Sequence, residues 1–212
     1  MADWHVQQGP FDIPDVPDFI PRRLKPYLFI FFVLIIQFSG GVYLAAASDM
    51  VGTKAVMQED ILMAGYASLI GMAINFAMMF RIKFRFSTRN QLLVSGMVLI
   101  AANVICAYTA SVPLLVGTCF VAGWFRMQAT FACNSTIQLW LTPVRDMAIF
   151  FCYVYIIVDS VIQLSGIATI YTAFFSQWEY MHWIMTGMLA LMMLMVMILV
   201  KPVRGPMFIP LL

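Results

Sequence analysis

Residues 123–134 read Gly-Trp-Phe-Arg-Met-Gln-Ala-Thr-Phe-Ala-Cys-Asn and place one arginine, Arg126, inside a long apolar segment. An arginine at the centre of a membrane helix costs from about 3 to more than 10 kcal/mol, depending on how the cost is measured. A sequence that keeps such a residue usually uses it. We therefore take Arg126 as the first candidate functional residue and work outward from it.

The composition indicates that lipid, and not water, surrounds most of this chain. Of 212 residues, 63% are hydrophobic and only 10% are charged, and the mean hydropathy is +0.90. Water-soluble domains carry about 25% charged and 45–50% apolar residues. The first 27 residues are polar and contain five prolines. This is not the pattern of a signal peptide, so the first membrane helix is expected to serve as the targeting signal.

Six apolar runs are long enough to cross a bilayer core of about 30 Å, which takes about 20 helical residues. Backbone groups in lipid must be satisfied within the chain, so these runs are expected to be helices. The predicted spans are Tyr27–Ala47, Ile61–Phe80, Gln91–Ala107, Pro113–Leu141, Met147–Phe175 and Trp183–Val200. The fourth and fifth exceed one span and are expected to tilt or protrude. The prediction is an all-α membrane protein with a tail (1–26), a six-helix bundle (27–200) and a C-terminal segment (201–212).

The basic residues predict the orientation of these helices. Lys54 alone falls on one side of the six predicted spans, and Arg126 lies within a span. The other ten of the twelve basic residues fall on the opposite side: Arg22, Arg23, Lys25, Arg81, Lys83, Arg85, Arg89, Arg145, Lys201 and Arg204. Because cytoplasmic loops of membrane proteins are enriched in Lys and Arg, both termini are expected in the cytoplasm, with the protein in the inner membrane of the cell.

The predicted spans also contain an acid, Asp159, in the fifth run. Arg126 lies 13 residues from Pro113 and Asp159 lies 16 residues from Phe175, so in antiparallel helices their depths differ by only about 4–5 Å. The geometry allows a pair that responds to protons or substrate, and equally a static pair that locks two helices. Further polar residues are candidates to line a pathway beside this pair: Gln37, Ser39, Asn75, Gln128, Thr130, Asn134 and Gln163. Arg126, Thr130 and Asn134 share a helix face through their spacing of four residues.

The sequence shows no motif typical of an enzyme active site, a metal site or a nucleotide-binding site. The two histidines, His5 and His182, fall on opposite sides of the predicted membrane, and no P-loop is present. The cysteines have no CxxC spacing and are interpreted as buried thiols: Cys106, Cys119, Cys133 and Cys152. We therefore expect no enzyme, metal site, cofactor or nucleic-acid partner, although an intramembrane enzyme with a further catalytic pair stays open.

Several motifs resemble those of one transporter family. Phe125-Arg126-Met127-Gln128-Ala129 is similar to Arg-x-x-Gln-Gly, with its glutamine one position early. Residues 80–89, Phe-Arg-Ile-Lys-Phe-Arg-Phe-Ser-Thr-Arg, look like Gly-Arg-Leu-Ala-Asp-Arg-Phe-Gly-Arg-Arg; Arg81, Arg85 and Arg89 match, and the acid and both glycines are absent. Residues 178–183, Trp-Glu-Tyr-Met-His-Trp, resemble Trp-Arg-Trp-x-Phe. Over nearly its whole length the chain resembles the N-terminal six-helix half of a major facilitator superfamily transporter, most like the fourteen-helix drug:proton antiporters.

The resemblance implies two inverted three-helix repeats and transport of a small molecule by alternating access, in a proton-coupled exporter. It implies that Arg126 lies in the substrate or proton pathway and that Arg81, Arg85 and Arg89 belong to a cytoplasmic gate loop. Ser39 stands where such antiporters often have an aspartate, and the fifth run carries Asp159 in place of a Gly-Pro motif. Residues 206–212 look like the start of a linker, so a C-terminal half or a second copy is the expected partner. The alternative is a six-helix membrane scaffold or partner subunit that transports nothing.

Overall fold

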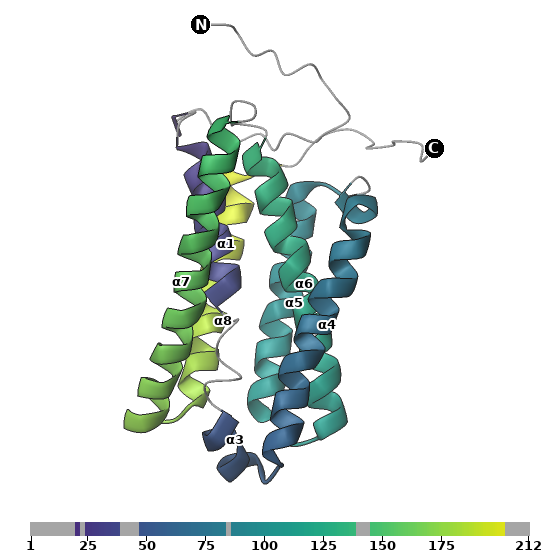
Figure 1. Ribbon diagram of the computed structural model, residues 1–212, viewed down its shortest axis with the longest axis vertical. Coiled ribbons are helices and arrows are strands. Elements are labelled where there is room, and N and C mark those ends of the chain that lie inside the picture. The colour runs from purple at the N-terminus through teal and green to yellow at the C-terminus, as the bar shows by residue number, and fades with distance from the viewer. Residues whose placement is uncertain (1–19, 22–23, 39–46, 84–85, 139–144, 202–212) are drawn as a thin grey trace, which may run out of the picture.

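Long antiparallel helices make up the protein in a computed structural model, which describes residues 20–21, 24–38, 47–83, 86–138 and 145–201 (Figure 1). In chain order the helices are α1 Lys25–Phe38, α3 Ala47–Lys54, α4 Gln58–Lys83, α5 Thr88–Tyr108, α6 Val112–Gln138, α7 Arg145–Phe175 and α8 Glu179–Leu199. The part of the chain described here contains no strand. The expected all-α membrane protein is confirmed at this level.

Five of the six predicted spans are helices long and apolar enough to cross a membrane: α4, α5, α6, α7 and α8. α6 has 27 residues and α7 has 31, so they are roughly 40 and 46 Å long and exceed one bilayer core, as expected. The described part of α1 has only 14 residues and ends at Phe38. The structure therefore supports a multi-pass membrane protein with five full-length spans and one shorter apolar helix.

Three predicted boundaries are wrong at the end of the bundle that carries α3, here called the α3 end. Ala47 does not end the first span but begins α3, an eight-residue helix in a segment that we expected to be a loop. α4 begins three residues early, at Gln58, and α8 begins four residues early, at Glu179. Both helices carry acids in their first turn, where a negative charge is favourable beside the positive end of the helix dipole. The apolar runs alone did not include these polar first turns.

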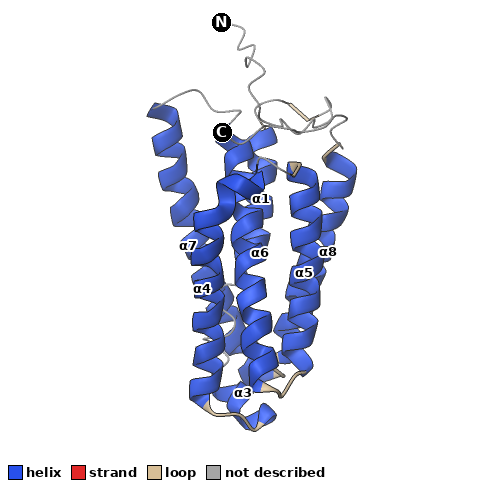
Figure 2. Ribbon diagram, turned by 90° about the vertical axis from the view of Figure 1, so that its right-hand side faces the viewer, coloured by secondary structure: helices blue, strands red, loops and turns tan. Residues whose placement is uncertain are grey.

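The long helices form two groups that meet along the middle of the bundle (Figures 1 and 2). One group contains α1, α7 and α8, and the other contains α4, α5 and α6. Within the groups, α1 contacts α7 and α8, and α6 contacts α4 and α5. Between them, α1 packs against α6 and α5 packs against α8. α1 and α6 are thus the central helices of the arrangement.

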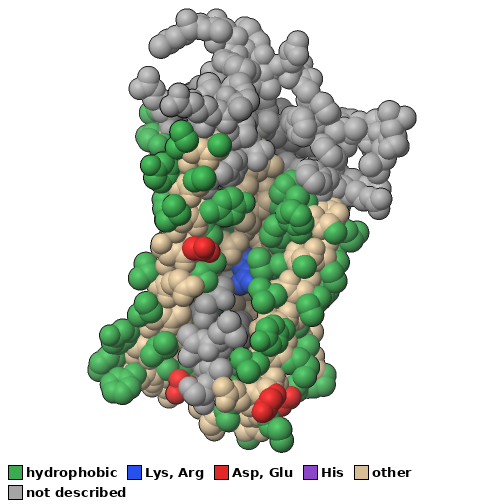
Figure 3. All heavy atoms as spheres, viewed as in Figure 1, with side chains coloured by type: hydrophobic (Ala, Val, Ile, Leu, Met, Phe, Trp, Pro, Cys, Tyr) green, Lys and Arg blue, Asp and Glu red, His purple; other side chains and the backbone are tan. Residues whose placement is uncertain are grey.

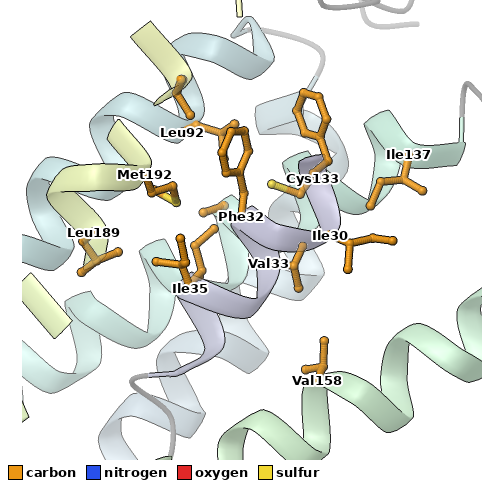
Figure 4. Packing of buried hydrophobic residues seen from close by; sticks show 14 of the residues in the cluster. Ile30, Phe32, Val33, Ile35, Leu92, Cys133, Ile137, Val158, Leu189 and Met192 are labelled. Carbon is orange, nitrogen blue, oxygen red and sulfur yellow. The ribbon is translucent and has the colours of Figure 1, made fainter. Parts of the chain in front are cut away.

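α1 is buried around most of its circumference, as expected for a helix that is apolar on every side. Phe29, Phe32 and Ile36 have no exposed surface. Figure 4 shows the same cluster drawing side chains from α5, α6, α7 and α8 around α1. Leu92, Cys133, Val158 and Met192 are its contributions from these four helices, in that order. The sequence therefore places its most uniformly apolar helix at the centre of the bundle.

α4 and α6 make the closest helix contact that the structure describes. A Cβ atom built on Gly71 would lie 2.2 Å from the carbonyl oxygen of Phe120, and one on Gly123 would lie 1.9 Å from that of Ser68. Each helix therefore presents one glycine to the backbone of the other. Small residues permit such close approach in membranes, where van der Waals packing drives helix association.

Three residues connect α3 to the other helices at the α3 end of the bundle. We name these residues, Thr53 and Lys54 of α3 and Trp178 before α8, the clasp. Lys54 Nζ donates hydrogen bonds to the carbonyl oxygens of Cys106 and Thr109, the latter at 2.8 Å, at the C-terminal end of α5. The same Nζ lies 5.1 Å from the centre of the Trp178 ring. Trp178, just before α8, donates from Nε1 to Thr53 Oγ1 at 2.9 Å. The clasp thus joins the two groups of helices through α3.

Replacing Lys54 by methionine is expected to destabilise the protein by about 1 kcal/mol, because two carbonyl groups at the end of α5 lose their donor. Burial lowers the pKa of Lys54 from its ordinary value of 10.5, and the nearby Cys106, Glu179 and Cys119 partly offset this. Between the lowered pKa and 10.5 the unfolded chain binds more protons, so stability rises with pH in that window. Lys54→Met should remove this slope.

Unfolding of purified protein in detergent, followed at neutral and alkaline pH, measures both effects. Lys54→Arg is the matched control, since it keeps a donor and a charge in place. If Lys54→Met were as stable as the parent and kept the same pH slope, Lys54 would not contribute to the stability of the clasp.

Candidate functional site

Arg126 lies near the middle of α6, and its side chain reaches across to α4. Its Nη2 donates to Ser68 Oγ at 3.3 Å and to Met72 Sδ at 3.0 Å, and only 9% of the residue is exposed. α4 approaches closely enough for these contacts because Gly123, one turn earlier on α6, lies against the backbone of Ser68. The guanidinium is therefore held at mid-span by a hydroxyl and a thioether.

Thr130 extends the polar site from Arg126 toward α1. Its Oγ1 donates to the carbonyl oxygen of Arg126 at 2.9 Å and accepts a hydrogen bond from Gln37 Nε2 at 2.8 Å. Gln37 and Thr130 are both buried. Gln37, Thr130 and Arg126, which the sequence predicts for one pathway, thus lie together along α6, which contacts both α1 and α4.

Asp159 and Gln163 lie on the exposed part of α7, one turn apart. Among the described residues, Asp159 makes no ion pair with Arg126, and α7 packs against α1 and α8. Figure 3 shows an acidic patch on the α7 side of one face and a basic patch recessed between the two groups at similar height. The face therefore carries both signs of charge at similar height.

Gln128, two residues after Arg126 on α6, joins a second polar network, which reaches α4 at Asn75 and not at Ser68 and Met72. Its Oε1 accepts from Asn75 Nδ2 of α4 at 3.1 Å, and its Nε2 donates to Gln91 Oε1 of α5 at 2.7 Å. Gln91 in turn donates to the carbonyl oxygen of Phe86 at 2.6 Å. This network of side chains fixes α4, α5 and α6 together and runs toward the start of α5.

Gln128→Met is expected to destabilise the protein by about 1–2 kcal/mol, because two buried hydrogen bonds between helices are lost and each contributes about 0.6–1.7 kcal/mol in membranes. The control is Gln163→Met, since Gln163 is exposed and hydrogen-bonds to no described residue. Unfolding in detergent compares the two variants with the parent. Equal losses for both substitutions would contradict a specific role for the Gln128 network.

The remaining predicted site residues have separate positions. Ser39 and Arg85 lie outside the described residues, and Arg81 is in the last turns of α4. Arg89, in the first turn of α5, donates from Nη2 to the carbonyl oxygen of Met197 at 3.4 Å, close to the end of α8. Asn134 is half-buried on α6, and its Oδ1 accepts no hydrogen bond from the described residues. Neither Arg89 nor Asn134 joins the Arg126 cluster among the described contacts.

The sequence reasoning missed Ser68 and Met72, the α4 partners of Arg126, and Gln91, the partner of Gln128. Serine and methionine are unremarkable in an apolar helix, so only the pairing of helices identifies them. Gln91 could have been found, since it is a polar residue at the start of a predicted span. Gly71 on α4 was a usable signal, because small residues mark close helix contacts.

Chemically, the site offers one permanent cation and several hydrogen-bonding side chains, while the carboxylate of Asp159 lies on α7, which packs against α1 and α8. Such groups bind and orient polar or charged molecules, or carry protons, inside a membrane. In the described ranges no three His, Cys, Asp or Glu side chains gather in a way that would hold a metal ion. Comparison with models of known protein families and with curated proteins finds no match to this chain.

Proposed function

We propose that this protein is one six-helix half of a secondary transporter, which moves a small molecule across the inner membrane by alternating access with protons as the coupling ion. Arg126 is its central pathway residue, with Gln37 and Thr130 beside it and Asp159 across the same face. The proposed direction is export. The protein needs no cofactor and catalyses no covalent reaction.

The observation that carries the proposal is the position of the charges. Arg126 is held at mid-span beside α1 and α4, and Asp159 is exposed at mid-length on α7. An aspartate facing lipid at mid-span costs about 2.5–3.5 kcal/mol even on the mildest scale, so this face is better explained by water or protein beside it. α7 also has the smallest buried fraction among the five long spans. A partner or an aqueous pathway along this face accounts for both features.

The helix contacts support two inverted repeats, α1–α4–α5 and α6–α7–α8. In these repeats α1 corresponds to α6, α4 to α7 and α5 to α8. Exchanging corresponding helices turns the contact of α1 with α7 into that of α6 with α4, and the contact of α1 with α8 into that of α6 with α5. The contacts of α1 with α6 and of α5 with α8 map onto themselves. α1 and α6 run in opposite directions, as corresponding helices of an inverted repeat must.

The proposed orientation puts the α3 end outside the cell and the basic ends of α4, α5 and α7 in the cytoplasm, with both termini. A second six-helix unit, either a further segment of the polypeptide or a second copy, completes the pathway along the face of α1, α4, α6 and α7. The lipid bilayer and a small-molecule substrate are the other partners.

The alternative function is a scaffold or partner subunit without transport. It is favoured by the contacts of Arg126 with Ser68 and Met72, which also fasten α6 to α4. In a scaffold, Arg126→Met would leave the binding of a partner intact because the methionine still fills the space. In a transporter, the same substitution stops transport while the protein still folds.

Flux in reconstituted vesicles distinguishes the two functions. Purified protein is inserted into liposomes, a proton gradient is imposed, and a fluorescent lipophilic cation and a fluorescent lipophilic anion serve as probes. Gradient-driven movement of either probe, lost in Arg126→Met, supports transport. Equal movement in vesicles with and without protein, across a panel of probes of both charges, would overturn it.

A further inference from the structure

Two cysteines near the α3 end lie within contact distance of each other. Cys106 is in the last turn of α5 and Cys119 is on α6, and their sulfur atoms are 3.9 Å apart. Only three residues link the two helices, and each cysteine is 1% exposed. Ala64 and Leu115 complete the cluster around them. The short link and the packing therefore hold the two thiols as neighbours.

Lys54 places a positive charge beside this pair. Its ammonium donates to the carbonyl oxygen of Cys106 and interacts electrostatically with the side chains of both Cys106 and Cys119. The thiolate is the species that attacks a disulfide, and the ammonium lies where this negative charge would form. The Trp178 ring, 5.1 Å from Nζ, lies over Lys54 and helps to hold the charge in position. The proximity of the two thiols and the fixed position of the Lys54 ammonium are two independent features of the same site.

We infer that Cys106 and Cys119 form an oxidisable dithiol, which closes to a disulfide by exchange with a small external disulfide. In the first step one thiolate attacks the reagent, forming a mixed disulfide and releasing one reagent thiol. In the second step the other cysteine attacks the mixed disulfide, forming the Cys106–Cys119 bond and releasing the second reagent thiol. The protein loses two electrons and two protons, and the reagent disulfide gains them.

The geometry favours the second step over a stable adduct. A disulfide bond is about 2.05 Å long, so the two sulfurs must approach by less than 2 Å from the 3.9 Å of the dithiol. Cys133 lies in the core around α1 and Cys152 is exposed on α7. The pair at the α3 end therefore lies apart from the surroundings of these two cysteines.

Reaction of the full-length protein with dithiodipyridine tests this inference, in a Cys133→Ala/Cys152→Ser background that leaves only the pair. The expected result is release of two pyridinethiones per protein, a mass lower by two hydrogens, no retained pyridyl group, and a peptide linking Cys106 to Cys119. Cys106→Ser in the same background should release one pyridinethione and retain one pyridyl group on Cys119. Lys54→Met should slow closure severalfold, and Lys54→Arg should restore it.

Two results would overturn the inference. One is retention of two pyridyl groups on the folded protein, which would mean that the thiols react separately. The other is no reaction when folded but full reaction after denaturation in SDS, which would mean that the native pair is inert. If the background substitutions impair folding, the parent protein with all four cysteines is treated with dithiodipyridine instead. Peptide mapping then shows whether Cys106 is linked to Cys119. Neither readout depends on transport, so the inference and the proposed function stand or fall separately.

Discussion

An alanine at position 123 is expected to destabilise the helix bundle by about 3 kcal/mol, because overpacking a close contact costs about 1–3 kcal/mol and sometimes more. The new Cβ would lie 1.9 Å from the carbonyl oxygen of Ser68 and 2.8 Å from its Cα. These are backbone atoms, so no side-chain rotation relieves the clash, and α4 must move away from α6. Gly71→Ala should have a similar effect, since its Cβ would meet the carbonyl oxygen of Phe120 at 2.2 Å.

The control lies on the same helix. Gly117 of α6 has no heavy atom within 4 Å of its ideal Cβ position, so Gly117→Ala should be neutral or stabilising by about 0.5–1 kcal/mol. Unfolding by SDS titration in detergent micelles measures all three variants. Equal stability of Gly123→Ala and Gly117→Ala would contradict the close contact between α4 and α6.

The second large effect is expected at Arg126. Under the proposed function, Arg126→Ala should reduce gradient-driven flux to the background of protein-free vesicles, because it removes the permanent cation from the pathway. Arg126→Lys should retain part of the flux, since an ammonium keeps the charge but loses the planar fork of donors. The measurement is flux per folded protein in vesicles.

Stability must be measured beside flux, because Arg126 also contacts Ser68 and Met72. Arg126→Ala should insert and unfold cooperatively, with a stability close to that of the parent, since removing a buried charge offsets the lost hydrogen bonds. Asp159→Asn is the companion variant. Because the side chain of Asp159 is exposed, this substitution should not change the stability of the protein. Flux through the variant should no longer depend on the proton gradient. Unchanged flux in Arg126→Ala would remove the basis of the transport proposal.

The helices could be predicted from the sequence because an apolar run of about 20 residues that crosses a bilayer forms a helix. Five of six predicted spans agree with long helices. α3 was missed because an eight-residue helix carrying Ser48, Asp49 and Thr53 has no apolar run. Its stability comes from the clasp, whose partners are 52 to 125 residues away along the chain. Such distant contacts leave no local pattern.

The candidate site could be predicted in part. A charge in an apolar segment is conspicuous, so the sequence singles out Arg126 and Asp159 as candidates, and Thr130, four residues after Arg126, donates to its carbonyl oxygen within α6. The partner of Arg126 could not be predicted, because electrostatic reasoning pairs a cation with an acid, whereas the structure provides Ser68 and Met72. Gln128, predicted for the same pathway, hydrogen-bonds to Asn75 and Gln91, which the spacing along α6 alone does not indicate.

The central position of α1 has a consequence for biogenesis. The helices that it contacts, α6, α7 and α8, all leave the ribosome after it. Until they arrive, the phenylalanines and isoleucines of α1 can rest in hydrocarbon, because lipid tails are as apolar as these side chains. Hydrocarbon offers no hydrogen-bond acceptor to the amide of Gln37, and its acceptor on Thr130 is translated 93 residues later. Translation must therefore run 93 residues past Gln37 before its acceptor exists, and to the end of α8 at Leu199 before α1 has all of these neighbours.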